Sequence, residues 1–266
     1  MGFLLGWPSL AHTLLSGLMA FATTTPDIAS IAAVAALWRV TLGLSGGVAA
    51  LALLAAAGAA GLPTGLGPRL PLAAVALRAG ACVLLATQSL ALVGWSIGAS
   101  NALVADVAHS PLLTAALAAP QPPAGILAAL IAVVPYMALL VVLAVVYAVR
   151  LVELVILAVL APLVLAAAIH PAAESLARAW LGEFAAVLLL QPVQAVMLVV
   201  FQVAVIALPA ATSPIEALVS SLALLYLTVR LPGWLRRFAH TAGLGAVVDA
   251  ASRAAGALLA ASVGGP

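Results

Sequence analysis

Charged side chains are scarce in this sequence of 266 residues. Aspartate, glutamate, lysine and arginine together make up 6% of the chain, whereas hydrophobic residues make up 67%. A soluble domain carries roughly 25% charged residues, so this chain cannot cover a surface that faces water. Its mean hydropathy is +1.33, and several apolar runs reach the roughly 20 residues that cross a bilayer core as a helix. The composition predicts an all-α protein, a polytopic bundle of transmembrane helices.

Several kinds of chemistry are also missing. The net charge of +2 comes from nine arginines and no lysine, so basic character alone is a poor argument for nucleic-acid binding. The single cysteine, Cys82, excludes an internal disulfide framework and a cysteine-based metal site. The four histidines are scattered, and no HExxH, Walker A or dinucleotide-binding motif occurs. The sequence therefore predicts a protein that is not an enzyme, with no catalytic residue, no metal site and no cofactor.

The chain is predicted to have three parts. Residues 1–33 form an interfacial N-terminal segment, because the TTTP motif at 23–26 interrupts a short apolar run and Trp7 suits the headgroup region. The alternative is a poorly ordered apolar leader. Residues 34–232 form the transmembrane domain, and residues 233–266 form an amphipathic C-terminal tail in the cytoplasm. We expect transmembrane spans near residues 38–61, 72–97, 125–169, 184–208 and 215–231, with polar-leaning connections at 98–124 and 170–183.

The number of spans depends on the apolar run 125–169. Two crossings there would give six spans, and one crossing gives five. No turn-forming residue lies near Arg150, so a hairpin at that point is unfavourable. One crossing also leaves the arginine-free segment 98–124 outside, as the positive-inside rule prefers. We therefore expect five spans, with six as the alternative, an outside N-terminus, and a cytoplasmic side that holds Arg69, Arg78, Arg178, Arg230, Arg236 and Arg237.

Two charges interrupt the apolar stretch AVVYAVRLVELVILAVLAP at residues 144–162. Positions 150 and 153 share one face of a helix, so Arg150 and Glu153 can form an intramembrane ion pair. Charges in hydrocarbon are costly and usually face a bundle interior, an aqueous cavity or an interface. Such a pair lines a pathway or fixes a subunit contact. The alternative is a structural ion pair at a membrane boundary.

Glutamines form a polar stripe in the next span. Gln191, Gln194 and Gln202 fall within an arc of about 80° at 100° per residue. Such a face either lines a pore or supplies hydrogen bonds between helices, and the second use is the commoner. Gln88 in the second span is a candidate partner for this face.

Three further features concern the geometry of the helices. Pro162 removes a backbone donor and clashes with the carbonyl of residue 158, so it predicts a helix kink. Trp180 suits an interfacial anchor, because its indole N–H stays near water while its rings are apolar. Gly43 and Gly47 lie four residues apart and suit close helix packing.

Several segments recur in an order that resembles one known family. They are SNALVADV after the second span, then RLVELVILAVLAPLVLAAAIHP, ARAWLGEF, LLLQPVQAVMLVV and VRLPGWLRRFA. This order, over residues 100–239, resembles the VirB6/TrbL family of polytopic inner-membrane components of type IV secretion and conjugation systems. The resemblance implies a multi-pass protein of the cytoplasmic membrane, with an outside N-terminus, an inside C-terminus and a role in passing DNA or protein.

Three functions fit the sequence. The first is a channel or scaffold subunit of a type IV secretion machine, expected to be a homo-oligomer that works with other secretion subunits, including a VirB4-like ATPase. Its remaining partners would be membrane lipid and the translocated DNA or protein. The second is a subunit of a small-solute or ion transporter, which usually needs intramembrane ionisable groups and inverted repeats. Only Arg150 and Glu153 meet the first need, and no repeat is visible. The third is a membrane scaffold without a path of its own.

Overall fold

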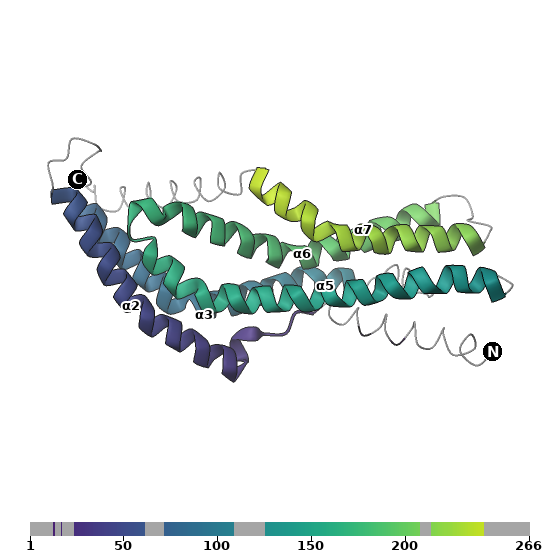
Figure 1. The fold of residues 1–266 in the computed structure, drawn as a ribbon, viewed down its shortest axis with the longest axis horizontal. Coiled ribbons are helices and arrows are strands. Elements are labelled where there is room, and N and C mark those ends of the chain that lie inside the picture. The colour runs from purple at the N-terminus through teal and green to yellow at the C-terminus, as the bar shows by residue number, and fades with distance from the viewer. Residues whose placement is uncertain are drawn as a thin grey trace. The chain divides into compact units, whose positions relative to one another are not determined.

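Long helices account for most of the chain in the computed structural model, which describes residues 13, 17, 24–61, 72–108, 126–207 and 214–241. No strand occurs among these residues, and the all-α prediction is confirmed. Figure 1 labels the long helices, which are separated by short connections or by residues outside the described set. The long helices are α2 (Ala32–Gly61), α3 (Leu72–Ala108), α5 (Ile126–Ala167), α6 (Glu174–Ala207) and α7 (Pro214–Thr241), and the short 3-10 helices are η1 (Ile28–Ser30) and η2 (Pro171–Ala173).

Four helical segments are long and apolar enough to cross a membrane, counting only the described residues. The fifth expected span, 215–231, lies within α7, and a total of five spans remains a prediction. The four candidate spans are Ala32–Gly58, Ala73–Ala105, Met137–Ala167 and Pro171–Met197.

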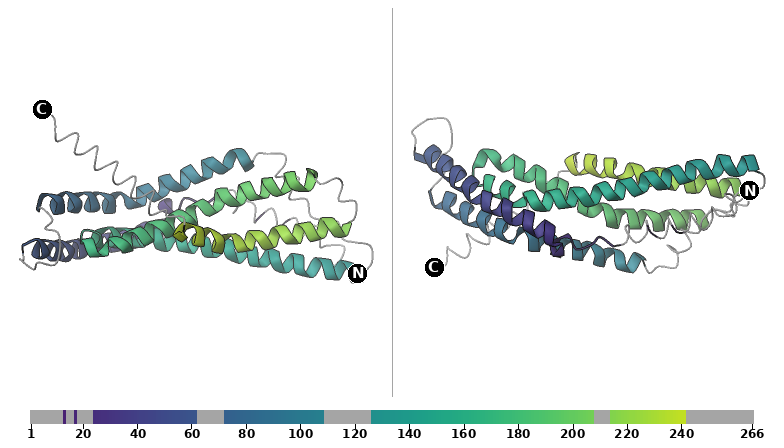
Figure 2. Two further views of the ribbon diagram at one scale, coloured as in Figure 1. Left: turned by 90° about the horizontal axis from the view of Figure 1, so that it is seen from above. Right: turned by 60° about the horizontal axis from the view of Figure 1, so that its bottom comes forward.

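The long apolar run forms one unbroken helix, α5, which Figures 1 and 2 both draw as a continuous ribbon. Its 42 residues correspond to about 63 Å at 1.5 Å per residue, about twice the thickness of a bilayer core. A helix without a turn crosses the membrane once. The six-span alternative, which needs a hairpin within 125–169, is therefore wrong.

Several boundaries differ from those expected from the sequence. Helix α6 begins at Glu174, within the connection expected at 170–183 and before the span expected at 184–208. The connection at 98–124 was expected to begin at residue 98, but α3 continues to Ala108. The stretch GASNALVADVA contains no proline, and the next helix-breaking residue is Pro111. Helix α7 likewise passes through Pro232 and ends at Thr241, so the first residues assigned to the tail are helical. The interfacial segment predicted at residues 1–33 lies mostly outside the described residues.

Exposure follows the opposite pattern from that of a soluble protein. Leu51 and Leu54 on α2 are each 70% exposed, and Trp95 on α3 is 74% exposed. Gln191 and Gln194 on α6 are 0% exposed. Apolar side chains thus cover the outside of these helices and polar ones lie within, which is the arrangement that lipid favours and water disfavours.

The chain divides into two compact units, and each long helix except α2 contributes residues to both. Unit 1 contains the buried arginine described below. Unit 2 contains two groups of ion pairs and a small cavity. Unit 1 comprises Met1–Asp27, Gly94–Leu154 and Val187–Trp234, and unit 2 comprises Ile28–Val93, Val155–Ala186 and Leu235–Pro266.

Candidate functional site: a buried arginine in unit 1

Arg150 lies inside the candidate span of α5 and is only 3% exposed. Its Nε donates to the carbonyl oxygen of Val187 at 3.1 Å. Its Nη2 donates to the hydroxyl oxygen of Thr25 and to Oε1 of Gln191, each at 3.0 Å. All three acceptors are neutral. A buried charge is tolerated only when hydrogen bonds replace its water, and here backbone, hydroxyl and amide dipoles supply them.

Gln191 is the centre of this arrangement, which we call the polar cluster: Thr25, Ser100, Asn101, Arg150 and Gln191. Its Oε1 accepts from Arg150 and also from the Thr25 hydroxyl. Its Nε2 donates to Oδ1 of Asn101 at 3.0 Å, and the Ser100 hydroxyl lies 3.5 Å from Oε1. One buried amide therefore joins α3, α5, α6 and the segment that precedes η1. Within unit 1, Gln191 acts as hydrogen-bond glue between helices.

Asn101 fixes the non-helical segment that carries Thr25. The backbone N–H of Thr25 donates to Oδ1 of Asn101, and Nδ2 of Asn101 donates to the carbonyl oxygen of Thr25, both at 2.9 Å. Extended backbone inside a membrane protein needs partners for both of these groups, because hydrocarbon offers none. A single side-chain amide supplies both, and Thr25 is consequently only 4% exposed.

Pro192 explains why the Ser100 side chain bonds to the backbone of α6 at this level. Proline has no N–H, so the carbonyl of Leu188, four residues earlier, loses its helical donor. The Ser100 hydroxyl donates to that oxygen at 3.3 Å. Arg150 donates to the preceding carbonyl, that of Val187. A proline in a transmembrane helix is tolerated when neighbouring groups satisfy the freed backbone in this way.

A double-mutant cycle tests the link between Ser100 and Pro192. Ser100→Ala should destabilise the native protein by about 1 kcal/mol, since the Leu188 carbonyl then lacks a donor. In a Pro192→Ala background the restored N–H can bond that carbonyl, and Ser100→Ala should cost clearly less. The SDS concentration at half-unfolding gives the four values needed for the coupling energy. Equal costs in both backgrounds would contradict the assignment.

The site residues predicted from the sequence differ in burial and in hydrogen bonding. Arg150, Gln191 and Gln194 are buried in unit 1, but Gln194 has no hydrogen bond on either amide atom in the described part of the chain. Glu153 is half-buried. The hydrogen bonds of Arg150 described above go to Gln191, Thr25 and Val187, so its pairing with Glu153 stays a prediction. The side chain of Gln202 lies outside the described residues, and Gln88 is exposed.

Thr25, Ser100 and Asn101 were not predicted as site residues. Each lies in a stretch that the sequence did mark as unusual, TTTP for Thr25 and SNALVADV for the other two. The available signal was a polar residue beside an apolar helix. That signal indicates a helix end as readily as a buried contact.

Unit 2 holds two groups of ion pairs, one at Glu174 and one at Glu183, with arginines from three helices. Arg78 on α3 donates to both the carbonyl oxygen of Ala168 (2.8 Å) and the carboxylate of Glu174 (3.1 Å). Arg178 bonds to the other oxygen of Glu174 at 2.6 Å, and Arg236 on α7 pairs with Glu183 at 2.8 Å. The five-span topology puts Arg78, Arg178 and Arg236 on one side of the membrane. The sidedness of these arginines stays a prediction.

A comparison with known families identifies the chain. Residues 76–263, which are 188 of its 266 residues, match the family described as Conjugal transfer protein TrbL. The chain belongs to the TrbL family. The resemblance proposed from the sequence is thus confirmed, and the protein is a membrane component of a conjugal transfer system. No curated protein and no solved structure matches the chain.

The TrbL match includes most of the polar cluster but not all of it. Ser100, Asn101, Arg150 and Gln191 lie within residues 76–263, whereas Thr25 lies before them. The part of the chain that aligns with TrbL therefore supplies the guanidinium and both amides, and the preceding segment supplies the hydroxyl.

Pro162 and Trp180 of this TrbL-family protein lie in unit 2. The indole Nε1 of Trp180 donates to the carbonyl oxygen of Leu157 at 3.1 Å, and the Thr41 hydroxyl donates to that of Val159 at 2.7 Å. These carbonyls flank residue 158, whose helical donor Pro162 removes. Side-chain donors thus gather where α5 is weakened, as at Pro192. The kink at Pro162 and the interfacial role of Trp180 stay predictions.

Gly43 and Gly47 make no close helix contact within the described structure. Both are exposed, and a Cβ atom built on either would have nothing within 4 Å. The same residues complete the pattern G-x-S-x-G, which marks a nucleophile only on a turn between a strand and a helix. Here the pattern lies inside α2, and the hydroxyl of Ser45 donates to the Leu42 carbonyl at 2.7 Å. It therefore carries no catalytic geometry.

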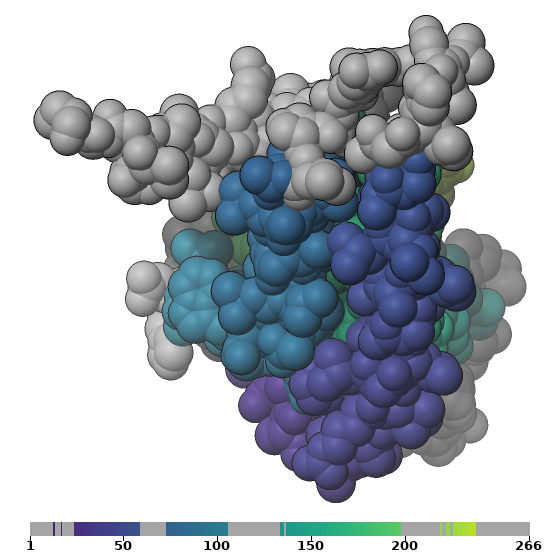
Figure 3. All heavy atoms as spheres, turned by 90° about the vertical axis from the view of Figure 1, so that its left-hand side faces the viewer, coloured from purple at the N-terminus to yellow at the C-terminus, as the bar shows by residue number. Residues whose placement is uncertain are grey.

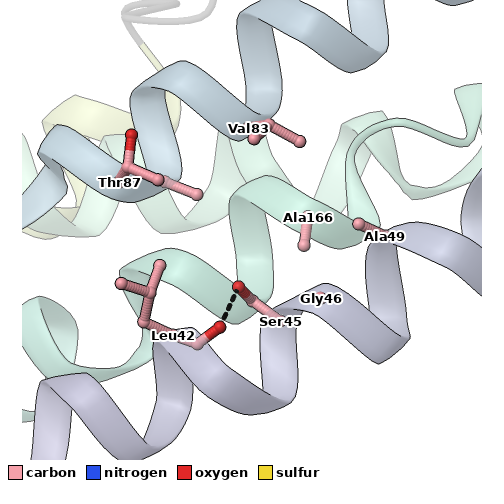
Figure 4. Close-up of a pocket in the computed structure, with 8 residues that line it drawn as sticks. Leu42, Ser45, Gly46, Ala49, Val83, Thr87 and Ala166 are labelled. Atoms are coloured by element: carbon pink, nitrogen blue, oxygen red, sulfur yellow. Dashed lines mark hydrogen bonds between the residues drawn. The ribbon is translucent and has the colours of Figure 1, made fainter.

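A cavity of about 210 Å³ lies in unit 2 beside Ser45. Its lining consists mostly of small and apolar residues of α2 and α3, and α5 contributes Ala166, as Figure 4 shows. Figure 3 looks onto α2 and α3, and atoms from later in the chain are visible between them. The lining offers few polar groups and no charge, so this cavity suits apolar material rather than a polar ligand.

Proposed function

We propose that this protein is a channel or scaffold subunit of a type IV secretion machine and helps to pass DNA or protein across the cytoplasmic membrane. The TrbL match over residues 76–263 carries the proposal. The polar cluster adds support, because an ionisable residue buried within a transmembrane helix is more often functional than structural.

We propose that the protein carries no catalytic chemistry of its own. Its sequence contains no nucleotide-binding motif, so we propose that other secretion subunits, including a VirB4-like ATPase, supply the energy. We further propose a homo-oligomer in the cytoplasmic membrane. The open faces of Gly43 and Gly47 on α2 support self-association, because residues without side chains let two helices approach closely.

Conjugation between donor and recipient cells tests the role in transfer. Deleting the gene from the donor should reduce transconjugants to the background level, and a plasmid copy should restore them. Formaldehyde crosslinking during mating then separates a channel from a scaffold, because only a channel subunit lies close enough to co-precipitate with the transferred DNA strand. Undiminished transfer from the deletion strain would contradict the proposal.

A subunit of a small-solute or ion transporter is the second candidate, favoured by the buried guanidinium of Arg150. The purified protein reconstituted alone into liposomes distinguishes the two. A transporter would move a solute or ion without other subunits, and that activity would fall in Arg150→Met. A secretion subunit would show no such flux and would restore conjugation in the deletion strain.

A further inference from the structure

Two glutamines one turn apart on α6 have opposite surroundings. Gln191 and Gln194 are both 0% exposed, and residues three apart lie on the same helix face. Both amide atoms of Gln191 are hydrogen-bonded within the polar cluster. Neither Nε2 nor Oε1 of Gln194 has a hydrogen-bond partner in the part of the chain that the structure describes. The two side chains are equally buried, so their different hydrogen bonding reflects the groups that surround each amide.

An unpaired amide in a protein interior is strongly disfavoured. It offers two donors and an acceptor with two lone pairs, and burying such a group without bonds costs more than any bond it could have gained. Leu190 and Ala195, buried beside it on α6, show that apolar side chains are accommodated there. A leucine at position 194 would fill similar space without that cost. The amide therefore indicates a ligand with both donors and acceptors.

We propose that Gln194 lines a hydrated site inside unit 1, in which water bonds to its amide. Water fits because one molecule can both donate to the amide oxygen and accept from the amide nitrogen. A lipid chain cannot bond to an amide, and another helix cannot reach a side chain with no exposed surface. The site extends the polar face of α6 by one turn beyond the cluster. It stands apart from the transfer role and would exist equally in a transporter or a scaffold.

Hydroxyl-radical footprinting of the purified full-length protein in nanodiscs tests the site. X-rays generate radicals from water in place, so side chains beside buried water oxidise faster than those in dry packing. Leu190 lies one turn from Gln194, and Leu154 on α5 is an equally apolar reference with 0% exposure. In the native protein we expect Leu190 to oxidise at least fivefold faster than Leu154, with oxygen-18 incorporated from labelled water.

Two variants make the result specific to the amide. Gln194→Leu breaks no hydrogen bond of the described structure, so it should fold, and the Leu190 rate should fall to that of Leu154. Gln194→Asn retains an amide and should retain most of the faster oxidation. The proposal is overturned if Leu190 oxidises no faster than Leu154 in the native protein. It is equally overturned if Gln194→Leu leaves the Leu190 rate unchanged.

Discussion

Arg150→Glu should prevent the protein from accumulating in folded form. The new carboxylate would face the carbonyl of Val187, Oε1 of Gln191 and the Thr25 hydroxyl, whose proton is already donated to Oε1 of Gln191. Acceptors that now receive three hydrogen bonds would instead repel a buried anion. We expect a loss of at least about 4 kcal/mol, the scale measured when a buried charge loses its partners. Temperature-dependent gel filtration of a fluorescent fusion measures the folded fraction.

Two control variants separate the contribution of the polar cluster from that of the predicted ion pair. Arg150→Met keeps the apolar stem and removes the charge, so it should cost about 1–2 kcal/mol for the hydrogen bonds that the three acceptors lose. Glu153→Gln removes the charge that the predicted ion pair requires. If the polar cluster holds Arg150, Glu153→Gln should cost less than Arg150→Met. A cost for Glu153→Gln that matches Arg150→Glu would show that the pair dominates and the cluster does not.

The second large effect is expected at Gln191, where one substitution affects three partners. Gln191→Leu removes an acceptor from Arg150 and from the Thr25 hydroxyl, and it leaves Asn101 without the donor from Nε2. Neutral hydrogen bonds between transmembrane helices average about 0.6 kcal/mol, whereas those to a charged group reach about 1.5–3 kcal/mol. We therefore expect a total loss of about 3 kcal/mol, most of it from the bond to the guanidinium.

Gln194→Leu is the matched comparison for that prediction. Both glutamines are fully buried on the same helix, but within the described structure only Gln191 has hydrogen bonds to other protein groups. Gln194→Leu should change the stability by less than about 1 kcal/mol. SDS titration of both variants measures the difference directly. Equal losses at the two positions would mean that the burial of an amide, and not its bonds, sets the cost.

The sequence alone predicted the helices well because their signal is local. Apolar runs long enough for a bilayer identified each long helix, and the absence of a turn residue near Arg150 favoured the single helix α5. The ends were less accurate, as α3 shows. A helix end depends on which backbone groups find partners, and Asn101 finds its partner in Thr25, 76 residues away.

The cluster could be predicted only in part, for the same physical reason. Depth in an apolar run marked Arg150 and Gln191 as important. Their mutual contact spans 41 residues, and that between Thr25 and Gln191 spans 166. Spacing rules along one helix reach three or four residues, so the only partner they could offer Arg150 was Glu153. They also could not distinguish Gln191 from Gln194, since both satisfy the same angular pattern.

The spacing of the Arg150 partners along the chain sets an order of events during synthesis. Gln191 is made 41 residues after Arg150, which at about 5–20 residues per second is a delay of about 2 to 8 s. Residues leave the ribosome in the order of their synthesis, so the guanidinium emerges ahead of both α6 acceptors by about this interval. The insertion machinery must therefore keep this helix near water or protein until α6 arrives. A chain released before residue 187 would present an arginine without its α6 acceptors in its membrane helix, a feature by which quality-control proteases could distinguish unfinished from completed chains.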